Sequence, residues 1–406
     1  MWSDKKFSTR AVAEWVDWQR GDVASPIHLS STYELPGIDP EMSLEEIDPS
    51  EGEFIYQRLS NPTRFAVEQQ VAGLEDGMYG FVFSSGTAAI STALLSLVQP
   101  GEHIVAFDDL YAGTRRMFEG LFDDHLGIEV EFVDARETDA VANAVRPDTA
   151  LVWMETPTNP LIQLCDIEAI AEIAAQHDAL FGVDNTFASP YFQRPLELGA
   201  DLVAHSTTKY LNGHSDGVGG ALITDSSPIA EEIQFSQQVA LGNQLSPFDS
   251  YLLGRGMKTL PMRMRQHEAN ATALAEFLAD HDLVEQVRYP GLKSHPQHDL
   301  AREQMDGYGG VLSFDLVGGI PEAKAFCESL RVANLAVSLG GVETLVNHAA
   351  TMTHEPLGPE RRADIGIGDG LIRVSVGLEA IDDLVADFER GFSAVQSPSD
   401  RTATTQ

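Results

Sequence analysis

The 406-residue chain is 43% hydrophobic and carries a formal net charge of −36, so it can bury more than one core. This charge argues against nucleic acid as a partner, because phosphate backbones attract cationic surfaces. No apolar run is long enough to cross a bilayer, and the charged first twenty residues do not resemble a signal peptide. We therefore expect a cytoplasmic protein with no membrane partner.

Lysine is scarce in this chain, since 20 of the 26 basic residues are arginine and 6 are lysine. Excess carboxylate with little lysine suits a high-salt cytoplasm, in which salt screens the self-repulsion. The sequence therefore favours a halophilic source. Cys165 and Cys327 are far apart and show no metal-ligand spacing, so we expect neither a disulfide nor a metal site.

Residues 1–60 are predicted to form an irregular arm rather than a domain. Prolines interrupt the segment, and residues 41–53 are acidic and weakly apolar. At its end, Tyr56 and Arg58 are two residues apart and can point the same way from an extended backbone. Alone, that pair is a weak indication of an anion site.

Residues 61–255 alternate apolar runs with helical patterns, which predicts a large, mostly parallel sheet covered on both faces. Helices are expected from Gly86 to about Leu97 and after Asp166, which can cap the second helix. The strand candidates are residues 81–83, 104–107, 130–133, 151–154, 181–183 and 202–204.

Residues 256–394 are predicted to form a smaller C-terminal α/β domain. A long helix over residues 262–280 opens this part of the chain, and strands are expected at 311–316 and 371–376. Residues 395–406 are polar and lack periodicity, which predicts a disordered tail.

Polar groups gather where the predicted strands of the large domain end, which is where ligands bind in such sheets. Ser85-Gly86-Thr87 lies at a strand-to-helix turn and offers backbone N–H groups to a phosphate. Ser206 and Thr208 could complete the phosphate shell. Asp184 ends an apolar strand, where a carboxylate is costly unless it meets a cation. Tyr111 follows another strand and could stack on an aromatic ligand.

Lys209 lies 25 residues after Asp184 (209 − 184), with the predicted strand 202–204 between them. This spacing brings both side chains to the same edge of one sheet. A lysine, an acidic partner, an anion cradle and a stacking aromatic ring are the groups that pyridoxal phosphate (PLP) requires. The sequence therefore predicts a PLP-dependent enzyme.

Several separated motifs resemble one family, the Cys/Met-metabolism (transsulfuration) PLP-dependent enzymes, over about residues 22–394. The resemblance implies fold type I of the PLP-dependent transferases, with a large domain, a C-terminal domain and an N-terminal arm. It also implies γ-replacement or γ-elimination on sulfur amino acids or homoserine esters, as in cystathionine γ-synthase and γ-lyase. The motifs are Tyr56-x-Arg58, Ser85-Gly86-Thr87, residues 155–160, 183–187, 206–214, 338–345, 352–354 and 372–378.

The resemblance also implies roles for the cofactor-binding residues. Lys209 would bind the PLP aldehyde covalently and later move protons, and Asp184 would keep the ring nitrogen protonated. Tyr111 would stack on the ring and assist proton transfer. The phosphate would be bound by four residues: Gly86, Thr87, Ser206 and Thr208.

The remaining matched residues concern the substrate and the assembly. Asn159, Ser338 and Arg373 would hold the amino-acid substrate, with Arg373 bidentate on its carboxylate. Tyr56 and Arg58 would reach the phosphate of a neighbouring subunit. The resemblance therefore implies a dimer with shared active sites, and a tetramer built from two such dimers.

Three positions leave the substrate open. Val337 stands where the cystathionine γ-enzymes commonly carry glutamate. A valine at this position resembles methionine γ-lyase instead. Against that resemblance, Gly113 stands where methionine γ-lyases carry a cysteine. Residues 237–240 also lack the Lys-Asp pair of those enzymes. The alternatives are therefore methionine γ-lyase, O-acetylhomoserine sulfhydrylase and, from other classes, a PLP aminotransferase or β-lyase, or a scaffold without catalysis.

Overall fold

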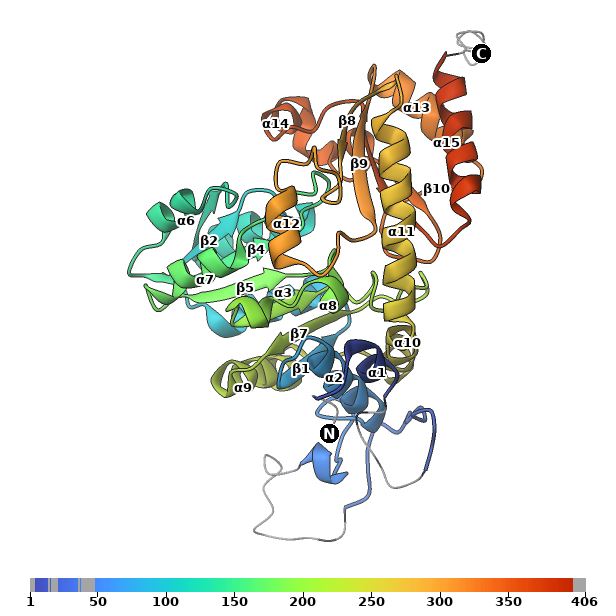
Figure 1. Cartoon of the computed structure of the whole chain (residues 1–406). Helices are drawn as coiled ribbons and strands as arrows, with labels where there is room; N and C mark the ends of the chain where they lie inside the picture. Colours follow the sequence, from blue (N-terminus) through green and yellow to red (C-terminus); the bar gives the residue numbers. More distant parts are fainter. Residues whose placement is uncertain (1–3, 14, 16–20, 36, 38–47, 397–406) are drawn as a thin grey trace, which may run out of the picture. The chain divides into compact units, whose positions relative to one another are not determined.

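The computed structural model describes residues 4–13, 15, 21–35, 37 and 48–396. The chain divides into two compact units (Figure 1). The first comprises Met1–Asp108, Gly113–Glu155 and Cys165–Pro261, and the second Asp109–Ala112, Thr156–Leu164 and Met262–Gln406. Residues 41–47 of the acidic stretch and residues 397–406 of the predicted tail lie outside the described residues.

Within its described residues, the first unit contains a seven-stranded sheet in the order β1-β7-β6-β5-β4-β2-β3. β7 is antiparallel to both neighbours, and the other neighbouring strands are parallel. Six of these strands were predicted. β7 was not, because glycines precede and open it, and glycine is a poor strand former. The strands are β1 (Tyr79–Phe83), β2 (His103–Phe107), β3 (Glu129–Val133), β4 (Thr149–Glu155), β5 (Leu180–Asp184), β6 (Leu202–His205) and β7 (Gly220–Thr224).

Helices of the first unit pack against this sheet, with α2 against β1, α3 against β7 and α7 against β5. The Asp166 carboxylate accepts a hydrogen bond from the Ala169 N–H at 3.0 Å, which confirms the predicted cap of α7. The α-helices are α2 (Pro62–Leu74), α3 (Gly86–Leu97), α4 (Ala112–Met117), α5 (Asp124–Leu126), α6 (Thr138–Ala144), α7 (Ile167–Ala175), α8 (Ser189–Phe192), α9 (Ser227–Phe235) and α10 (Pro247–Met257). There are also 3-10 helices at Pro49–Glu51 and Pro195–Leu198, and π-helices at Phe118–Asp123 and Ser236–Leu241.

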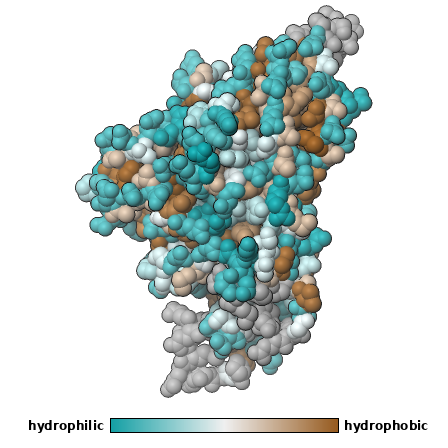
Figure 2. All heavy atoms as spheres, viewed as in Figure 1, coloured by the Kyte–Doolittle hydropathy of each residue, from teal (hydrophilic) through white to brown (hydrophobic). Residues whose placement is uncertain are grey.

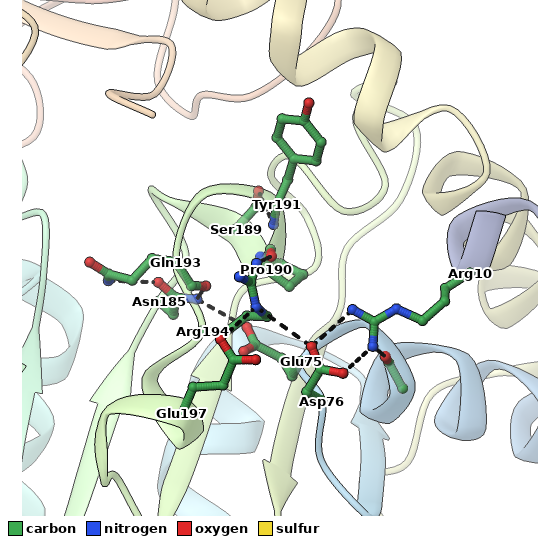
Figure 3. Close-up of polar contacts among 11 residues, drawn as sticks. Arg10, Glu75, Asp76, Asn185, Ser189, Pro190, Tyr191, Gln193, Arg194 and Glu197 are labelled. Atoms are coloured by element: carbon green, nitrogen blue, oxygen red, sulfur yellow. Dashed lines mark hydrogen bonds and ion pairs between the residues drawn. The ribbon is translucent and has the colours of Figure 1, made fainter. Parts of the chain in front are cut away.

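In the described part of the N-terminal arm, the short helix α1 (Phe7–Val12) is anchored by the buried Arg10. The Arg10 guanidinium donates to the Gly73 carbonyl at 2.9 Å and pairs with the Asp76 carboxylate. Arg194 lies on the other side of Asp76, at 3.5 Å, and also pairs with Glu197 at 3.0 Å (Figure 3). This chain of charges ties the beginning of the arm to the first unit.

The described part of the second unit contains a five-stranded sheet in the order β10-β11-β12-β9-β8. α11 matches the predicted long helix, and the predicted strands correspond to β9 and β12. The elements are α11 (Leu260–Ala279), β8 (Val284–Arg288), α12 (His298–Gln304), β9 (Val311–Leu316), α13 (Ile320–Ser329), β10 (Asn334–Leu335), β11 (Leu345–His348), α14 (Gly358–Asp364), β12 (Leu371–Ser375) and α15 (Ile381–Gln396), with turns at Ala349–Thr351 and Glu355–Leu357.

The core of the second unit lies between this sheet and the helices α11, α13 and α15. It is rich in aromatic rings, including Phe314, Phe326, Phe388 and Phe392. Phe326 meets Phe388 edge to face at 5.5 Å and Phe392 at 5.0 Å. Such ring pairs stabilise a core beyond the area they bury, so β9 and β12 have a firm support.

Hydrophilic residues predominate on the face shown in Figure 2, with hydrophobic ones scattered or in small groups among them. This agrees with the strongly acidic composition. Among the described residues, no helix has the length and apolar character needed to span a membrane.

Candidate functional site

An anion cradle lies where α3 begins in the first unit. The Ser85 hydroxyl accepts a hydrogen bond from the Ala88 N–H at 3.0 Å and caps the helix. Gly86 lies against Ser206 so closely that an added Cβ would be 2.9 Å from the Ser206 Cβ. The first N–H groups of a helix have no partner within the helix, and they attract anions. The structure therefore brings Gly86, the exposed Thr87 and Ser206 together at a helix N-terminus.

The loop that carries Lys209 is held by the glycine run that precedes β7. The Thr208 hydroxyl accepts from the Gly219 N–H at 3.1 Å and lies 3.3 Å from the Gly219 carbonyl oxygen. A Cβ on Gly219 would lie 2.4 Å from the Thr207 hydroxyl oxygen. Glycine is therefore needed at position 219 for this close backbone approach. In this structure the Thr208 hydroxyl bonds Gly219, and its role toward a phosphate stays a prediction.

Asp184 ends β5 and is only 8% exposed. Its Oδ1 accepts from the Thr186 hydroxyl at 2.5 Å and from the Thr186 N–H at 3.1 Å. The Thr186 hydroxyl in turn accepts from the Ser206 N–H at 2.8 Å. Thr186 therefore fixes the Asp184 carboxylate and links it to the loop that carries Lys209.

Burial raises the pKa of Asp184, and three neighbours oppose this effect: Thr186 through hydrogen bonds, and His205 and Lys209 through their positive charge. Lys209 follows β6, where its N–H donates to the Ser206 carbonyl at 3.2 Å and its carbonyl accepts from Gly213 at 2.8 Å. The predicted meeting of the Lys209 and Asp184 side chains at one sheet edge is consistent with this effect and stays a prediction.

These residues of the first unit fit PLP. Position 86 at the start of α3 requires glycine, since an added Cβ would collide with Ser206, and the backbone N–H groups there attract a phosphate. The buried Asp184 carboxylate needs a cationic partner, which a protonated pyridine nitrogen supplies. Lys209, whose charge lowers the pKa of Asp184, supplies the amine.

A second group of predicted residues meets in the second unit. Arg373 on β12 is 2% exposed, and its Nη1 donates to the Asn159 Oδ1 at 3.0 Å. Its Nη2 donates to the Ser338 carbonyl at 2.5 Å. Ser338 has a φ of +81°, which is unfavourable for a non-glycine residue. This conformation belongs to the loop that directs the Ser338 carbonyl at Arg373.

His354 supports this group. It is buried beside Asn159, and burial, together with the Arg373 charge, lowers its pKa to about 4. A hydrogen bond with the Asn159 backbone opposes that shift. The ring is therefore neutral at physiological pH, so it adds no second positive charge next to Arg373.

The other predicted residues are exposed. Tyr111 belongs to the second unit and is 48% exposed. The Arg58 guanidinium lies 5.7 Å from the Tyr56 ring centroid and donates to the Gln238 carbonyl of its own chain. Val337 precedes Ser338 and is 59% exposed. In the described part of the chain, no cluster of side chains could hold a metal ion.

An α/β fold with a lysine after β6 and a buried aspartate at the end of β5 is typical of a PLP-dependent enzyme. The chain belongs to the Cys/Met metabolism PLP-dependent enzyme family, whose model matches residues 9–393. PLP is therefore its cofactor.

The relatives of the chain carry out several related reactions. It is 46% identical to the cystathionine β-lyase of Coxiella burnetii and to the cystathionine γ-synthase of Mycobacterium bovis. Each alignment covers 91% of this chain and 92% of the relative. The crystal structure of cystathionine γ-lyase from Lactobacillus plantarum, complexed with L-serine, is 42% identical with a TM-score of 0.90, covering 97% of this chain and 100% of that chain.

Sequence reasoning missed the residues behind the predicted ones. The predicted site residues do not include Thr186, His354, His205 or Glu75, which is the partner of His205 in the structure. No local pattern reveals these residues, because each contacts a residue distant in the sequence or acts through a neighbour.

Proposed function

We propose that the protein catalyses γ-replacement or γ-elimination on sulfur amino acids or homoserine esters. The observation that carries this proposal is the buried Asp184 carboxylate, which Thr186 fixes and links to the loop that carries Lys209, in a chain of the Cys/Met-metabolism family. Relatives named cystathionine γ-synthase and γ-lyase, at 46% and 42% identity, support the γ-reactions.

The residues of the first unit hold the cofactor and move protons. PLP, when bound, withdraws electrons from the substrate carbon next to the amino group. The Asp184 carboxylate holds a proton on the ring nitrogen, and the cradle at Gly86, Thr87, Ser206 and Thr208 binds the phosphate. The Lys209 amine takes a proton from Cα, and a further deprotonation at Cβ lets the γ-substituent leave.

The residues of the second unit orient the amino acid. Arg373 binds the substrate carboxylate with two parallel hydrogen bonds, since its guanidinium is already oriented by Asn159 and Ser338. Because the Arg373 side chain is oriented before binding, it loses little entropy when the substrate arrives.

We propose that Tyr111 stacks on the PLP ring and assists proton transfer.

A second candidate reaction is β-elimination of cystathionine. The 46% identical relative from Coxiella burnetii is named a cystathionine β-lyase. The reactions differ in the carbon–sulfur bond that breaks. Cleavage at Cγ releases cysteine, 2-oxobutanoate and ammonia, whereas cleavage at Cβ releases homocysteine, pyruvate and ammonia. A γ-synthase instead joins cysteine to a homoserine ester and releases the acid.

A substrate panel separates these reactions. The holoenzyme is incubated with cystathionine, with methionine, and with O-acetylhomoserine or O-succinylhomoserine plus cysteine, and the products are identified by mass spectrometry. Cystathionine from an ester, or 2-oxobutanoate from any substrate, is the expected result. Pyruvate and homocysteine from cystathionine would favour the β-lyase, and amino-group exchange alone would overturn the proposal.

We propose further that the protein is a dimer with shared active sites, paired into a tetramer. Tyr56 and Arg58 end the arm with exposed side chains, as contacts to a neighbouring phosphate would need. Arg64 donates to the Gln57 and Leu59 carbonyls at 2.8 and 2.9 Å and fixes the backbone on both sides of Arg58. Tyr56→Phe and Arg58→Ala should weaken PLP binding, and light scattering should give the tetramer mass. A monomer that binds PLP fully would contradict the shared site.

The charge also bears on where the protein works. We propose a cytoplasmic enzyme of a halophilic organism, because a net charge of −36 destabilises a compact chain unless salt screens it. Dialysis into low salt should reduce both activity and helicity, and full activity there would contradict this proposal.

We also propose that residues 61–255 and 256–394 form two domains and that residues 1–60 form an arm. Limited proteolysis tests these bounds.

A further inference from the structure

A buried hydrogen bond joins two short segments of the second unit, Asp109–Ala112 and Thr156–Leu164. The Thr158 hydroxyl donates to the Asp109 Oδ2 at 2.5 Å, and the two residues are 0% and 7% exposed. Water does not readily replace a partner in such a buried bond, so losing it is costly. The bond therefore fixes the place of one segment relative to the other.

Each partner of this bond lies next to a residue of the proposed site. Tyr111, which is proposed to stack on the PLP ring, comes two positions after Asp109. Asn159 directly follows Thr158, and its Oδ1 accepts from the Arg373 Nη1 at 3.0 Å. The bond is therefore a short link between the stacking ring and the group that binds the substrate carboxylate.

Thr158 also closes the turn that carries Asn159. Its N–H donates to the Gln163 carbonyl at 3.0 Å, its carbonyl accepts from the Ile162 N–H at 3.2 Å, and its hydroxyl accepts from the Gln163 N–H at 3.0 Å. Ile162 has a φ of +56°, which a β-branched residue rarely adopts, so contacts around the turn must hold it in this conformation. The turn is thus one fixed piece, and the Thr158 hydroxyl joins it to Asp109.

The same turn is fixed on the sheet of the second unit beside Arg373. The Ser313 hydroxyl on β9 donates to the Pro160 carbonyl at 2.6 Å. Ser313 is directly opposite Arg373 in the antiparallel pair β9–β12, and side chains opposite each other lie on the same face of a sheet. Ser313 and Arg373 therefore hold neighbouring points of the turn, Pro160 and Asn159.

A substrate amino acid is held at two points in the proposed function. Its amino group is bound to PLP, on whose ring Tyr111 stacks, and its carboxylate is bound by Arg373. The separation of these two points has to fit the substrate, because a misplacement of about 1 Å can cost about a hundredfold in rate.

We propose that Asp109 and Thr158 are positioning residues of the active site. Their hydrogen bond sets the place of the Tyr111 ring relative to Arg373. This inference rests on the proposed function, which assigns Tyr111 to the cofactor ring and Arg373 to the substrate carboxylate. Asp109 and Thr158 act through these neighbours and are not assigned a contact with cofactor or substrate.

The test compares two variants of one residue in the holoenzyme. Thr158→Val keeps the shape of the side chain but removes the hydroxyl, whereas Thr158→Ser keeps the hydroxyl. The measured quantities are kcat and KM on the preferred substrate of the panel, the visible circular dichroism per bound PLP, and the urea midpoint of unfolding. Visible dichroism reports the asymmetric surroundings of the PLP ring, so it changes when a stacking side chain moves.

We expect Thr158→Val to lose about 10- to 100-fold in kcat/KM, mostly through KM, and to lose part of the visible dichroism. Thr158→Ser should keep both. If Thr158→Val lowers the urea midpoint while KM stays within about twofold of the wild type and the dichroism is unchanged, the bond only supports the fold and the inference is overturned.

Thr272→Val is the matched control. The Thr272 hydroxyl on α11 of the same unit bonds the Tyr289 hydroxyl at 3.2 Å, and neither residue is assigned to the site. This variant should leave KM and the visible dichroism unchanged even if the urea midpoint falls. A loss in KM and dichroism equal to that of Thr158→Val would contradict the inference.

Asp109→Asn decides the question if Thr158→Val does not fold. A carboxylate oxygen accepts a hydrogen bond more strongly than an amide oxygen, so KM should rise about threefold or more and the dichroism should change. Unchanged values of both would overturn the inference.

A double-mutant cycle tests whether the bond acts through the stacking ring. In Tyr111→Ala the ring is absent, so adding Thr158→Val should change the dichroism per bound PLP little further. An equal further change would contradict the inference. A wild type that binds no PLP, or that gives none of the γ-products, would overturn the proposed function instead.

Discussion

The replacement of Arg373 by lysine tests the substrate-binding group most sharply. Lysine keeps the positive charge but has a single nitrogen, so it cannot reach both the Asn159 Oδ1 and the Ser338 carbonyl while offering two parallel donors to a carboxylate. In the native protein the two guanidinium contacts measure 3.0 and 2.5 Å, and the side chain is 2% exposed.

The expected loss follows from these contacts. A hydrogen bond to a charged group contributes about 1.5–3 kcal/mol, and Arg373→Lys weakens one such bond to the substrate and loosens the support from Asn159 and Ser338. We expect a loss of about 2–4 kcal/mol in transition-state binding, which is about 30- to 1000-fold in kcat/KM. Most of the loss should fall on KM, because the proton transfer is assigned to Lys209.

The assay measures kcat and KM on the preferred substrate, with PLP absorbance recorded as a check on cofactor binding. Arg288→Lys is the matched control, since Arg288 on β8 of the same sheet pairs with Asp315 at 2.6 Å and is not assigned to substrate. A kcat/KM for Arg373→Lys within about threefold of the wild type would refute the assigned role, because it corresponds to less than about 1 kcal/mol.

Three further predictions concern the fold and the cofactor site. Gly220→Ala should lower the free energy of urea unfolding by about 1–3 kcal/mol, because its Cβ would lie 2.2 Å from the Ser85 carbonyl oxygen; an unchanged midpoint would contradict this. Thr186→Val should weaken PLP binding about tenfold, since it removes one hydrogen bond to the Asp184 charge; unchanged affinity would argue against the bond's importance. Stability should fall as pH drops from about 6.5 to 4, by up to about 3 kcal/mol for each histidine that stays neutral when folded but is protonated when unfolded. Such histidines are His267, His295 and His354, in which burial lowers the pKa to about 4. Urea titrations at several pH values measure the free energy of unfolding. If its dependence on pH is the same in His267→Gln as in the wild type, this prediction is contradicted.

Much of the fold follows from local sequence patterns. The cap at Asp166 and the apolar spacing after it place α7 correctly, because both signals lie within one helix. The polar ends of the strands likewise predict Asp184 and Lys209, since parallel strands bring their carboxyl ends to one edge. β7 was missed because it runs antiparallel and opens at Gly220, where the close approach to Ser85 excludes a side chain.

The supporting residues of the site could not be predicted in this way. Glu75 and His205 are 130 positions apart, and each alone is typical of an ordinary helix end or strand end. Arg373 reaches Asn159 across 214 positions. These contacts depend on which strands become neighbours, and a single sequence holds little information on that pairing.

Covalent mapping of the cofactor tests the central claim most directly. Sodium borohydride treatment of the holoenzyme makes the lysine–cofactor bond permanent, and peptide mass spectrometry then locates the modified residue among the six lysines of the chain. We predict modification at Lys209 in the wild type and none in Lys209→Ala, whose yellow colour should also be lost. Modification at another lysine, or a colourless wild type after reconstitution with PLP, would contradict the account.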